Sequence, residues 1–204
     1  MQCVRSLAVL KNFTVQKSTM PLNKYINPKK YGTKIKHLLV KLVLSLGVSI
    51  RVVCRVDKFK ITFITTSYIE YALRAQKSYE REKVTMHWLR YVIESEDVVY
   101  DIGANVGAYS LVAAKFLDGN VKVFAFEPGF ATFSQLQKNV FTNSFSDCIT
   151  PLPIALTDET GLQTFNYANI IPGGALHALG EPIDYKRDSF VPVGTQSMLA
   201  YSVD

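Results

Sequence analysis

Cysteine is scarce in this chain of 204 residues: there are three, and no two of them form a C-x-x-C pair. Because Cys3, Cys54 and Cys148 are widely spaced, neither a disulfide framework nor a thiolate zinc site is expected, and no other metal site is predicted. A reducing compartment, the cytoplasm, is the default expectation. Hydrophobic residues make up 48% of the chain and charged residues 20%, which excludes global disorder and allows a folded core.

Acidic residues are absent from the first 56 positions. Residues 1–60 contain thirteen Lys or Arg and a single acid, Asp57, whereas the rest of the chain contains ten Lys or Arg and sixteen acids. The overall net charge of +6 therefore combines +12 in the first region with −6 in the second. This asymmetry predicts two regions with different roles, a basic N-terminal arm over residues 1–57 and a folded domain over residues 58–204.

Long apolar runs are also missing. The longest charge-free run in the apolar part of the arm, residues 42–50, has nine residues, whereas a spanning helix needs about twenty. No transmembrane segment is therefore expected, and the apolar stretch after Arg5 is too short for a secretory signal. Residues 11–36 mix lysine with asparagine, proline and glycine without an apolar period, which predicts a loop or disorder there.

The apolar stretch that follows residue 36 predicts a short amphipathic helix, and three roles stay open for it. The helix can pack on the main domain with its lysines in solvent. It can instead contact an anionic membrane peripherally, because Lys36, Lys41, Arg51 and Arg55 flank its apolar residues. The third role is an organelle-targeting or nucleic-acid-binding arm. No nucleic-acid module is recognisable, so no specific nucleic-acid partner is expected.

The remainder of the chain alternates strand patterns with helix patterns. Strands are expected over residues 58–67, 98–102, 121–126, 148–156 and 161–167, and helices over residues 70–93, with a break near 78–80, and over 109–117 and 132–141. The run at 121–126 is nearly all apolar, as a parallel sheet covered on both faces requires. The alternation predicts an α/β fold with a doubly wound, mostly parallel sheet.

A glycine-rich turn follows the strand expected at 98–102. Gly103 and Gly107 would let the backbone turn tightly and approach a ligand closely. Asp101 stands at the carboxyl end of the strand, where doubly wound sheets bind ligands. Glu127 follows the next strand, twenty residues after Gly107, where a carboxylate can accept hydrogen bonds from both ribose hydroxyls. The pattern predicts a site for a nucleotide-like cofactor.

The turn differs from the common nucleotide motifs. A dinucleotide fingerprint has a central glycine where this chain has Asn105, and no Gly-Lys-Ser/Thr of a P-loop follows. An acid just before the turn would repel phosphate but suits a cationic amino-acid group. These features favour S-adenosylmethionine over NAD. An NAD-dependent oxidoreductase, and a purely structural role of the glycines in packing helix on strand, stay open as alternatives.

Four stretches of the sequence resemble motifs of one known protein family. Residues 98–107, V-V-Y-D-I-G-A-N-V-G, resemble the first motif of the FkbM family of S-adenosylmethionine-dependent methyltransferases, and F-E-P at 126–128 is similar to its second-strand motif. Residues 79–80, Tyr-Glu, resemble a pair that the family places upstream, and P-I-A-L-T-D at 153–158 resembles its third-strand turn. The resemblance runs from about residue 61 to 201 and leaves the basic arm uncovered.

The resemblance implies a Rossmann-like class I methyltransferase fold. It also implies O-methylation, in which a methyl group is transferred to the hydroxyl oxygen of a small molecule or glycan. Tyr79 and Glu80 would close the cofactor site from outside, and Ala155 would lie near the adenine. No catalytic base is predicted. The cofactor-binding residues that the resemblance implies are Tyr79, Glu80, Asp101, Gly103, Asn105, Gly107, Glu127 and Ala155.

Members of the family continue past the fourth strand with an I-D-x-x-G-x-E type motif, which this sequence lacks. We therefore expect the chain to correspond to the amino-terminal part of a methyltransferase, with a sheet that is incomplete on its C-terminal side, and to be inactive by itself. The alternative from a different class is a non-catalytic remnant of the cofactor fold that acts as a binding or membrane-tethering module through its basic arm.

Overall fold

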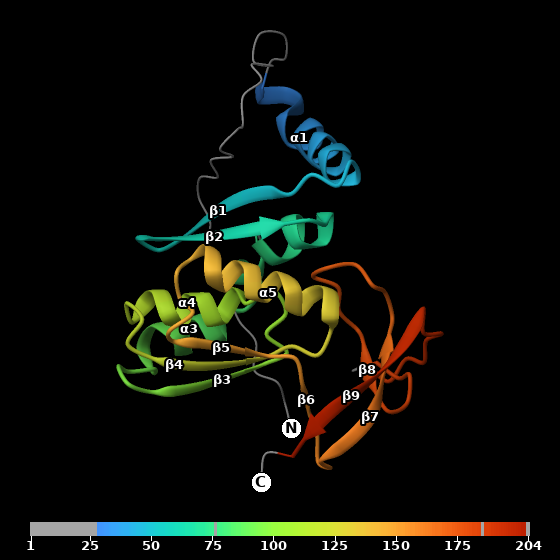
Figure 1. Cartoon of the computed structure of the whole chain (residues 1–204). Coiled ribbons are helices and arrows are strands. Elements are labelled where there is room, and N and C mark those ends of the chain that lie inside the picture. The colour runs from blue at the N-terminus through green and yellow to red at the C-terminus, as the bar shows by residue number, and fades with distance from the viewer. Residues whose placement is uncertain (1–27, 76, 185, 203–204) are drawn as a thin grey trace.

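The computed structural model describes residues 28–75, 77–184 and 186–202, and the expectations for residues 1–27 lie outside these ranges. Figure 1 shows the elements in layers. A parallel sheet lies at the bottom of this view, a layer of helices that includes α4 and α5 covers it, a β-hairpin lies above these helices, and helix α1 stands beyond the hairpin. A second sheet lies to the side and contains the C-terminal strands.

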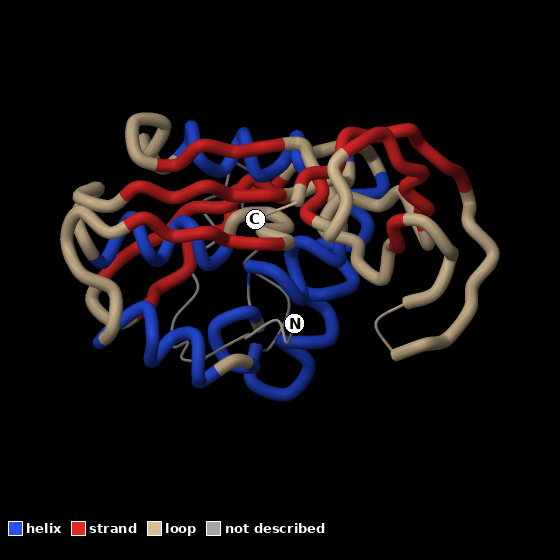
Figure 2. The backbone as a smooth tube through the Cα atoms, turned by 90° about the horizontal axis from the view of Figure 1, so that it is seen from below, coloured by secondary structure: helices blue, strands red, loops and turns tan. Residues whose placement is uncertain are grey.

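The main sheet has three parallel strands, in the order β3 (Val98–Ile102), β4 (Lys122–Phe126) and β5 (Ile149–Leu152). Helix α4 (Ala108–Phe116) connects β3 to β4, and α5 (Phe130–Thr142) connects β4 to β5. Figure 2 shows the strands of this sheet side by side from below. Consecutive βαβ units confirm the mixed α/β class and the parallel sheet.

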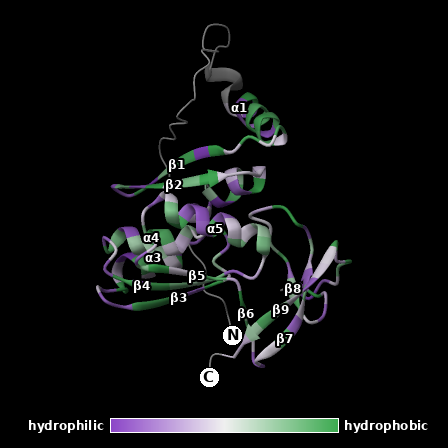
Figure 3. Cartoon of the chain, in the orientation of Figure 1, coloured by the Kyte–Doolittle hydropathy of each residue, from purple (hydrophilic) through white to green (hydrophobic). Residues whose placement is uncertain are grey.

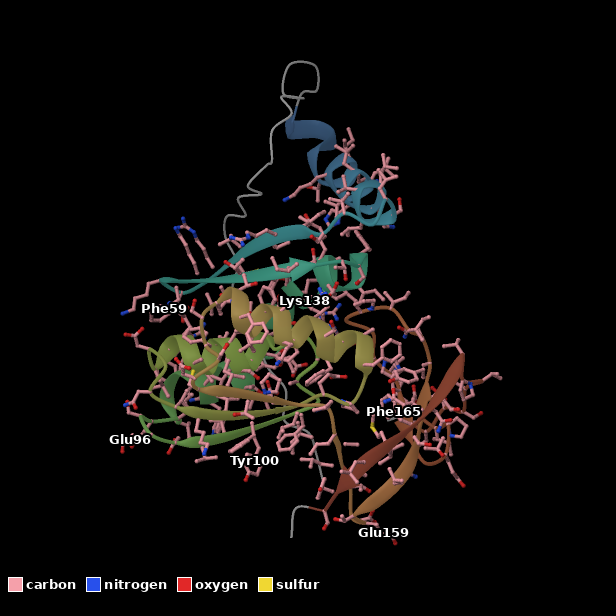
Figure 4. All side chains as sticks on the ribbon, viewed as in Figure 1. Phe59, Glu96, Tyr100, Lys138, Glu159 and Phe165 are labelled. Atoms are coloured by element: carbon pink, nitrogen blue, oxygen red, sulfur yellow. The ribbon has the colours of Figure 1, made fainter. Side chains whose placement is uncertain are left out.

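Only one face of the main sheet is covered by helices in the part of the chain that the structure describes. Val98, Tyr100 and Ile102 alternate along β3, and all three are exposed. The ring of Tyr100 lies edge-on to Phe124 and Phe126 of β4, on the face away from α4 and α5 (Figure 4). The expected second layer of a doubly wound sheet is therefore not seen, although the apolar residues of this face are those that such a layer would cover.

Strands β1 (Ile50–Val56) and β2 (Phe59–Thr65) form an antiparallel hairpin, paired from Ile50↔Thr65 to Val56↔Phe59. Cys54 and Phe63 are buried on the hairpin face that packs against α4 and α5. The boundary predicted after residue 57 falls in the turn between these paired strands. Residues 50–56, expected to belong to the arm, thus contribute a strand to the core.

Amide side chains on α5 and at its C-cap form hydrogen bonds with backbone N–H and carbonyl groups along the outer edge of β2. The Asn143 side chain accepts from the Thr62 N–H (2.9 Å) and donates to the Thr62 carbonyl (2.7 Å). The Ile64 N–H donates to Asn139 Oδ1, and Gln135 Nε2 donates to the Ile64 carbonyl, both at 2.8 Å. Because these three amides are four residues apart, they lie on one side of α5 and replace a neighbouring strand.

Helix α1 (Pro28–Ser45) begins within the region predicted to be a loop, so that prediction is wrong for residues 28–36. Val40 and Leu44 are buried against the rest of the domain, which agrees with a helix that packs on the domain. No helix among the described residues is long and apolar enough to cross a membrane.

The helical region predicted at 70–93 is confirmed, but the break predicted near 78–80 falls within a helix, and the region is interrupted at Lys77 and Glu82 instead. A π-helix, η1 (Glu70–Ala75), precedes α2 (Ser78–Arg81) and α3 (Lys83–Tyr91). The Glu70 Oε2 accepts from the N–H groups of Thr66 (2.6 Å) and Ser67 (2.8 Å). This carboxylate therefore caps the turn that starts the region.

The second sheet has four strands in the order β6-β9-β7-β8, of which only β6 and β9 are parallel. The strand predicted over residues 161–167 is confirmed. The strand predicted over 148–156 is divided, because the chain leaves the main sheet after Leu152 and enters the second sheet at Ala155. The strands of the second sheet are β6 (Ala155–Leu156), β7 (Gly161–Tyr167), β8 (Ala178–Leu179) and β9 (Gly194–Tyr201).

Candidate cofactor site

The turn between β3 and α4 is tied to the end of β4. The N–H groups of Gly103 and Ala104 both donate to the Phe126 carbonyl at 2.9 Å. Gly103, Asn105 and Gly107 have φ angles of 72°, 52° and 84°, in the left-handed region that favours glycine and tolerates asparagine. The local sequence therefore fixes a tight turn at the carboxyl edge of the sheet, where the ends of two strands meet.

The two glycines of this turn have different surroundings. A Cβ on Gly107 would lie 2.6 Å from Cδ1 of Leu136, a fully buried side chain on α5. A Cβ on Gly103 would meet no atom within 4 Å, and Gly103 is exposed. Gly107 is thus required for close packing of α5 on the turn, whereas Gly103 leaves open space beside the end of β3.

Glu127 holds this turn from the neighbouring strand. The residue is buried, with only 6% of its surface exposed. Oε2 accepts from the Asn105 N–H and Oε1 from the Gly129 N–H, both at 2.9 Å. Burial raises the pKa of Glu127 to about 7, although the two backbone hydrogen bonds and the charge of Arg74 oppose this shift. The site therefore contains a carboxyl group that titrates near neutral pH.

Asp101 accepts hydrogen bonds from the first turn of α4. Its Oδ2 accepts from the Ser110 N–H at 3.0 Å and from the Ser110 hydroxyl. A carboxylate beside the N-terminal N–H groups of a helix is favourable because it satisfies a free donor and complements the helix dipole. Asp101 therefore helps to orient α4 as well as standing at the end of β3.

Asn105 connects three parts of the site. Its backbone N–H binds Glu127, and its Nδ2 donates to the Gly174 carbonyl at 2.8 Å. Its Oδ1 is buried and has no hydrogen-bond partner among the described residues. A buried acceptor without a donor is costly, so this atom is a ready partner for an N–H or O–H group of a ligand.

The loop of residues 172–174, between β7 and β8, lies against this turn. In Figure 1 the segment between β7 and β8 rises from the second sheet towards α5. A Cβ on Gly173 would lie 2.7 Å from Cγ of Glu70, so a larger residue does not fit there. The loop is held by hydrogen bonds to Ser67, Arg74, Asn105 and Thr132, at 2.6, 2.8, 2.8 and 3.2 Å.

Two residues near Glu127, Arg74 and Tyr167, and His177, whose ring lies 5.3 Å from that of Tyr167, were not predicted as site residues. The Tyr167 hydroxyl accepts from the Phe130 N–H (3.2 Å) and donates to Gln196 (2.6 Å). His177 Nδ1 accepts from a backbone N–H, and burial, with a smaller effect of Arg74, lowers its pKa. Arg74 also acts on Glu127. These residues are far from the glycine turn in the sequence, so no local sequence pattern could have shown that they lie together.

Tyr79 and Glu80, the residues expected to close the site from outside, both lie on α2. Tyr79 is fully buried, and its hydroxyl donates to the Ala108 carbonyl at 3.3 Å. It therefore packs beneath the start of α4 and does not cover the turn from outside. Glu80 is exposed on α2. A contact of either residue with a cofactor stays a prediction.

Ala155 lies in the second sheet, where it pairs with Ala200. It is buried in a small cluster that also contains Tyr167, the residue that reaches the loop after Glu127. The position is compatible with the predicted place near an adenine, which stays a prediction. Among the described residues, no group of three or more His, Cys, Asp or Glu side chains could hold a metal ion.

No family model matches the sequence, and no match was found among curated proteins. Solved structures give distant similarities. One is a protein of Pyrococcus horikoshii described as a presumed transferase, with a TM-score of 0.39 and 17% identity over 63% of this chain and 56% of that chain. Another is a SAM-dependent methyltransferase from Agrobacterium tumefaciens, with a TM-score of 0.36 and 15% identity over 54% of this chain and 41% of that chain.

The match thus spans about half of each of these two proteins. Both TM-scores and both identities are low, so the case for a function rests on the site itself. Membership of the FkbM family stays a prediction.

Proposed function

We propose that the turn after β3 binds S-adenosylmethionine and that the protein is a methyltransferase that uses this cofactor. The observation that carries the proposal is the placement of Asp101 and Glu127 on neighbouring parallel strands, on either side of a turn that is open at Gly103. Carboxyl ends of parallel strands form the crevice in which α/β sheets bind ligands.

The residues of the turn fit the cofactor chemically. An ionised carboxylate has about four lone-pair positions, and each Glu127 oxygen accepts a backbone N–H in the structure. In its ionised form Glu127 can therefore still accept two ribose hydroxyls, and with a pKa of about 7 this form is present at neutral pH. The unpartnered Oδ1 of Asn105 suits the amino group of the cofactor. The open space at Gly103 lets a ligand approach the backbone.

When bound, the cofactor supplies an activated methyl group on its sulfonium. The protein then has to hold the acceptor in line with that group, which is a matter of orientation. We assign the acceptor to the hydroxyl class, of a small molecule or a sugar, on the strength of the family resemblance alone. No residue of this chain is assigned as the base.

Asn105 supports this proposal over an NAD site. In a dinucleotide fold, a glycine at the corresponding place lets the pyrophosphate approach the backbone. Here the Asn105 side chain is present and is bound to the Gly174 carbonyl. The Asp101 carboxylate would also repel a pyrophosphate. These groups make a poor phosphate cradle and a suitable site for a cationic ligand.

The test is a calorimetric titration of S-adenosylhomocysteine into the full chain, comparing Gly103→Ala with Gly119→Ala. Both glycines have a left-handed φ, 72° and 83°, and an added Cβ would meet nothing within 4 Å at either position. Both variants should therefore lose a similar stability, about 1–2 kcal/mol. Only Gly103→Ala should weaken binding, by about tenfold or more, because its methyl group fills the space left for the ligand.

The titration includes two further arms. Glu127→Gln should also weaken binding, since a ribose hydroxyl donates more strongly to a carboxylate than to an amide. NAD serves as a competing ligand and should not bind. Equal affinities in Gly103→Ala and Gly119→Ala, binding of NAD instead, or no binding by a chain shown to be folded by circular dichroism would each overturn the proposal.

A further inference from the structure

Helix α1 carries apolar side chains on two opposite faces. Val40 and Leu44 face the domain and are buried. Leu38, Leu42 and Leu46 lie four residues apart on the outer side of the helix and the turn after it, and they are 67%, 56% and 72% exposed. Leu39 and Val48 are exposed beside them. Figure 3 shows the described part of α1 largely in the colour of hydrophobic residues, at the end of the molecule farthest from the main sheet.

Exposed basic residues lie on the same helix and on the strand that follows it. Lys34 and Lys41 are exposed on α1, and Arg51 and Arg55 are exposed on the adjoining strand β1. No acid occurs before Asp57 in the sequence, so no carboxylate of this segment offsets these charges. An apolar stripe with cationic side chains at its border is the arrangement of helices that lie in a membrane interface, where the long lysine side chains can reach the headgroups.

A hollow of about 340 Å³ opens at the side of the same face. Within it, His37 Nδ1 lies 2.8 Å from the Tyr68 hydroxyl, and Lys41 Nζ lies 4.5 Å from the centre of the Tyr68 ring. These contacts hold a cation and a hydroxyl group close together, and Lys34 adds a second cation. The hollow is lined by Thr33, Lys34, His37, Leu38, Lys41 and Tyr68.

We propose that α1 docks this protein on the surface of an anionic membrane, with Leu38, Leu42 and Leu46 at the acyl boundary and a lipid phosphate in the hollow. The phosphate oxygens would accept from Lys34, Lys41 and the hydroxyl groups of the hollow. The proposal is independent of the proposed methyl transfer, because none of these residues belongs to the cofactor site.

Charge favours a membrane over the other occupants of an apolar face. A second copy of the chain would bring another acid-free, basic segment against the first, and like charges would repel. A nucleic acid would use the lysines but would leave the exposed leucines without a role. An anionic bilayer is attracted by the basic residues and also buries the leucines.

The test measures binding of the full chain to phosphatidylcholine vesicles with and without phosphatidylserine, by sedimentation at low and high salt. Leu42→Glu is compared with Val84→Glu, since Val84 is an exposed apolar residue on another helix, α3, with 65% of its surface accessible. Leu42→Glu should weaken binding at least tenfold, since it removes apolar area that the membrane would bury and adds a negative charge that the anionic lipids repel. Val84→Glu adds the same charge elsewhere and should not change binding.

A second pair tests the charges. Lys34→Glu with Lys41→Glu is compared with Lys83→Glu with Lys138→Glu, which changes the net charge equally at exposed positions away from α1. The first pair should lower the affinity by about 25-fold or more, because each basic residue near an anionic surface contributes about fivefold. The second pair should have a much smaller effect.

Each alternative occupant has its own outcome. Inorganic phosphate is titrated separately: saturable binding that depends on Lys34 and Lys41, without vesicle binding, would make the hollow an anion site and overturn the proposal. A dimer in light scattering that Leu42→Glu dissociates would assign the face to a second copy and would overturn it too. So would vesicle binding that needs no phosphatidylserine, or that is equal in Leu42→Glu and Val84→Glu. Binding that needs phosphatidylserine, weakens at high salt and is lost only in the α1 variants would confirm it.

Discussion

Replacing Gly107 by alanine should destabilise the protein through two separate effects that the structure allows to be estimated. The first is its φ of 84°, since a left-handed conformation costs a residue with a Cβ about 1–2 kcal/mol. The second is the contact of the new Cβ with Leu136 Cδ1 at 2.6 Å. Leu136 is fully buried, so it can move only by disturbing its neighbours, and such overpacking costs about 1–3 kcal/mol.

The expected total loss in the free energy of unfolding is about 2–5 kcal/mol. Gly119→Ala is the matched control, because Gly119 has a φ of 83° and no atom within 4 Å of an added Cβ. Gly119→Ala should lose only the about 1–2 kcal/mol that comes from the left-handed backbone conformation. Urea unfolding followed by circular dichroism and by the fluorescence of Trp88, the single tryptophan, gives both values.

A double variant separates the two effects further. In the Gly107→Ala background, truncation of Leu136 to alanine removes the clash, so it should cost less than the about 2–5 kcal/mol expected for Leu136→Ala alone. Equal losses in Gly107→Ala and Gly119→Ala, together with strictly additive effects of the two changes at positions 107 and 136, would refute the reasoning. Glycine at 107 would then be explained by its backbone conformation only.

Two further predictions concern Glu127 and Asn139. Because burial raises the pKa of Glu127 from the ordinary 4.5 to about 7, the folded state binds more protons than the unfolded state between these values. Stability should therefore fall by about 3 kcal/mol as the pH rises from about 4.5 to about 7, and a urea midpoint measured against pH should be flatter in Glu127→Gln. Asn139→Ala leaves the Ile64 N–H and the Val106 carbonyl without their partners, which should cost about 2–5 kcal/mol. An unchanged urea midpoint would contradict it.

Much of the main sheet follows from local sequence patterns. The alternation of apolar strands with helical periods indicates the βαβ units, and the glycines at 103 and 107 indicate the turn. Asp101 and Glu127 come together for a simple reason: each ends a strand, and the carboxyl ends of neighbouring parallel strands meet at one edge. The predicted order of elements from residue 98 to 142 thus needs no knowledge of long-range contacts.

Other features could not be predicted, because residues far apart in the sequence decide them. The residues of β1 have an apolar pattern, but the pairing of β1 with β2 places them in the core and not in an arm. Residues 148–156 form one apolar stretch in the sequence, which predicted a single strand. In the structure the stretch is divided between two sheets, because Ala155 pairs with β9. The burial of Tyr79 beneath α4 also depends on tertiary packing.

Sequence alone determined the α/β class, the glycine turn and the two acids at its sides, because local periodicity and strand order encode them. Only the tertiary structure distinguished Gly107, packed against Leu136, from the open Gly103. It alone brought the loop of residues 172–174 to Asn105 and showed that α1 leaves one apolar face in solvent. The physical reason is that close packing and exposure are set by which distant surfaces meet, and no local pattern carries that information.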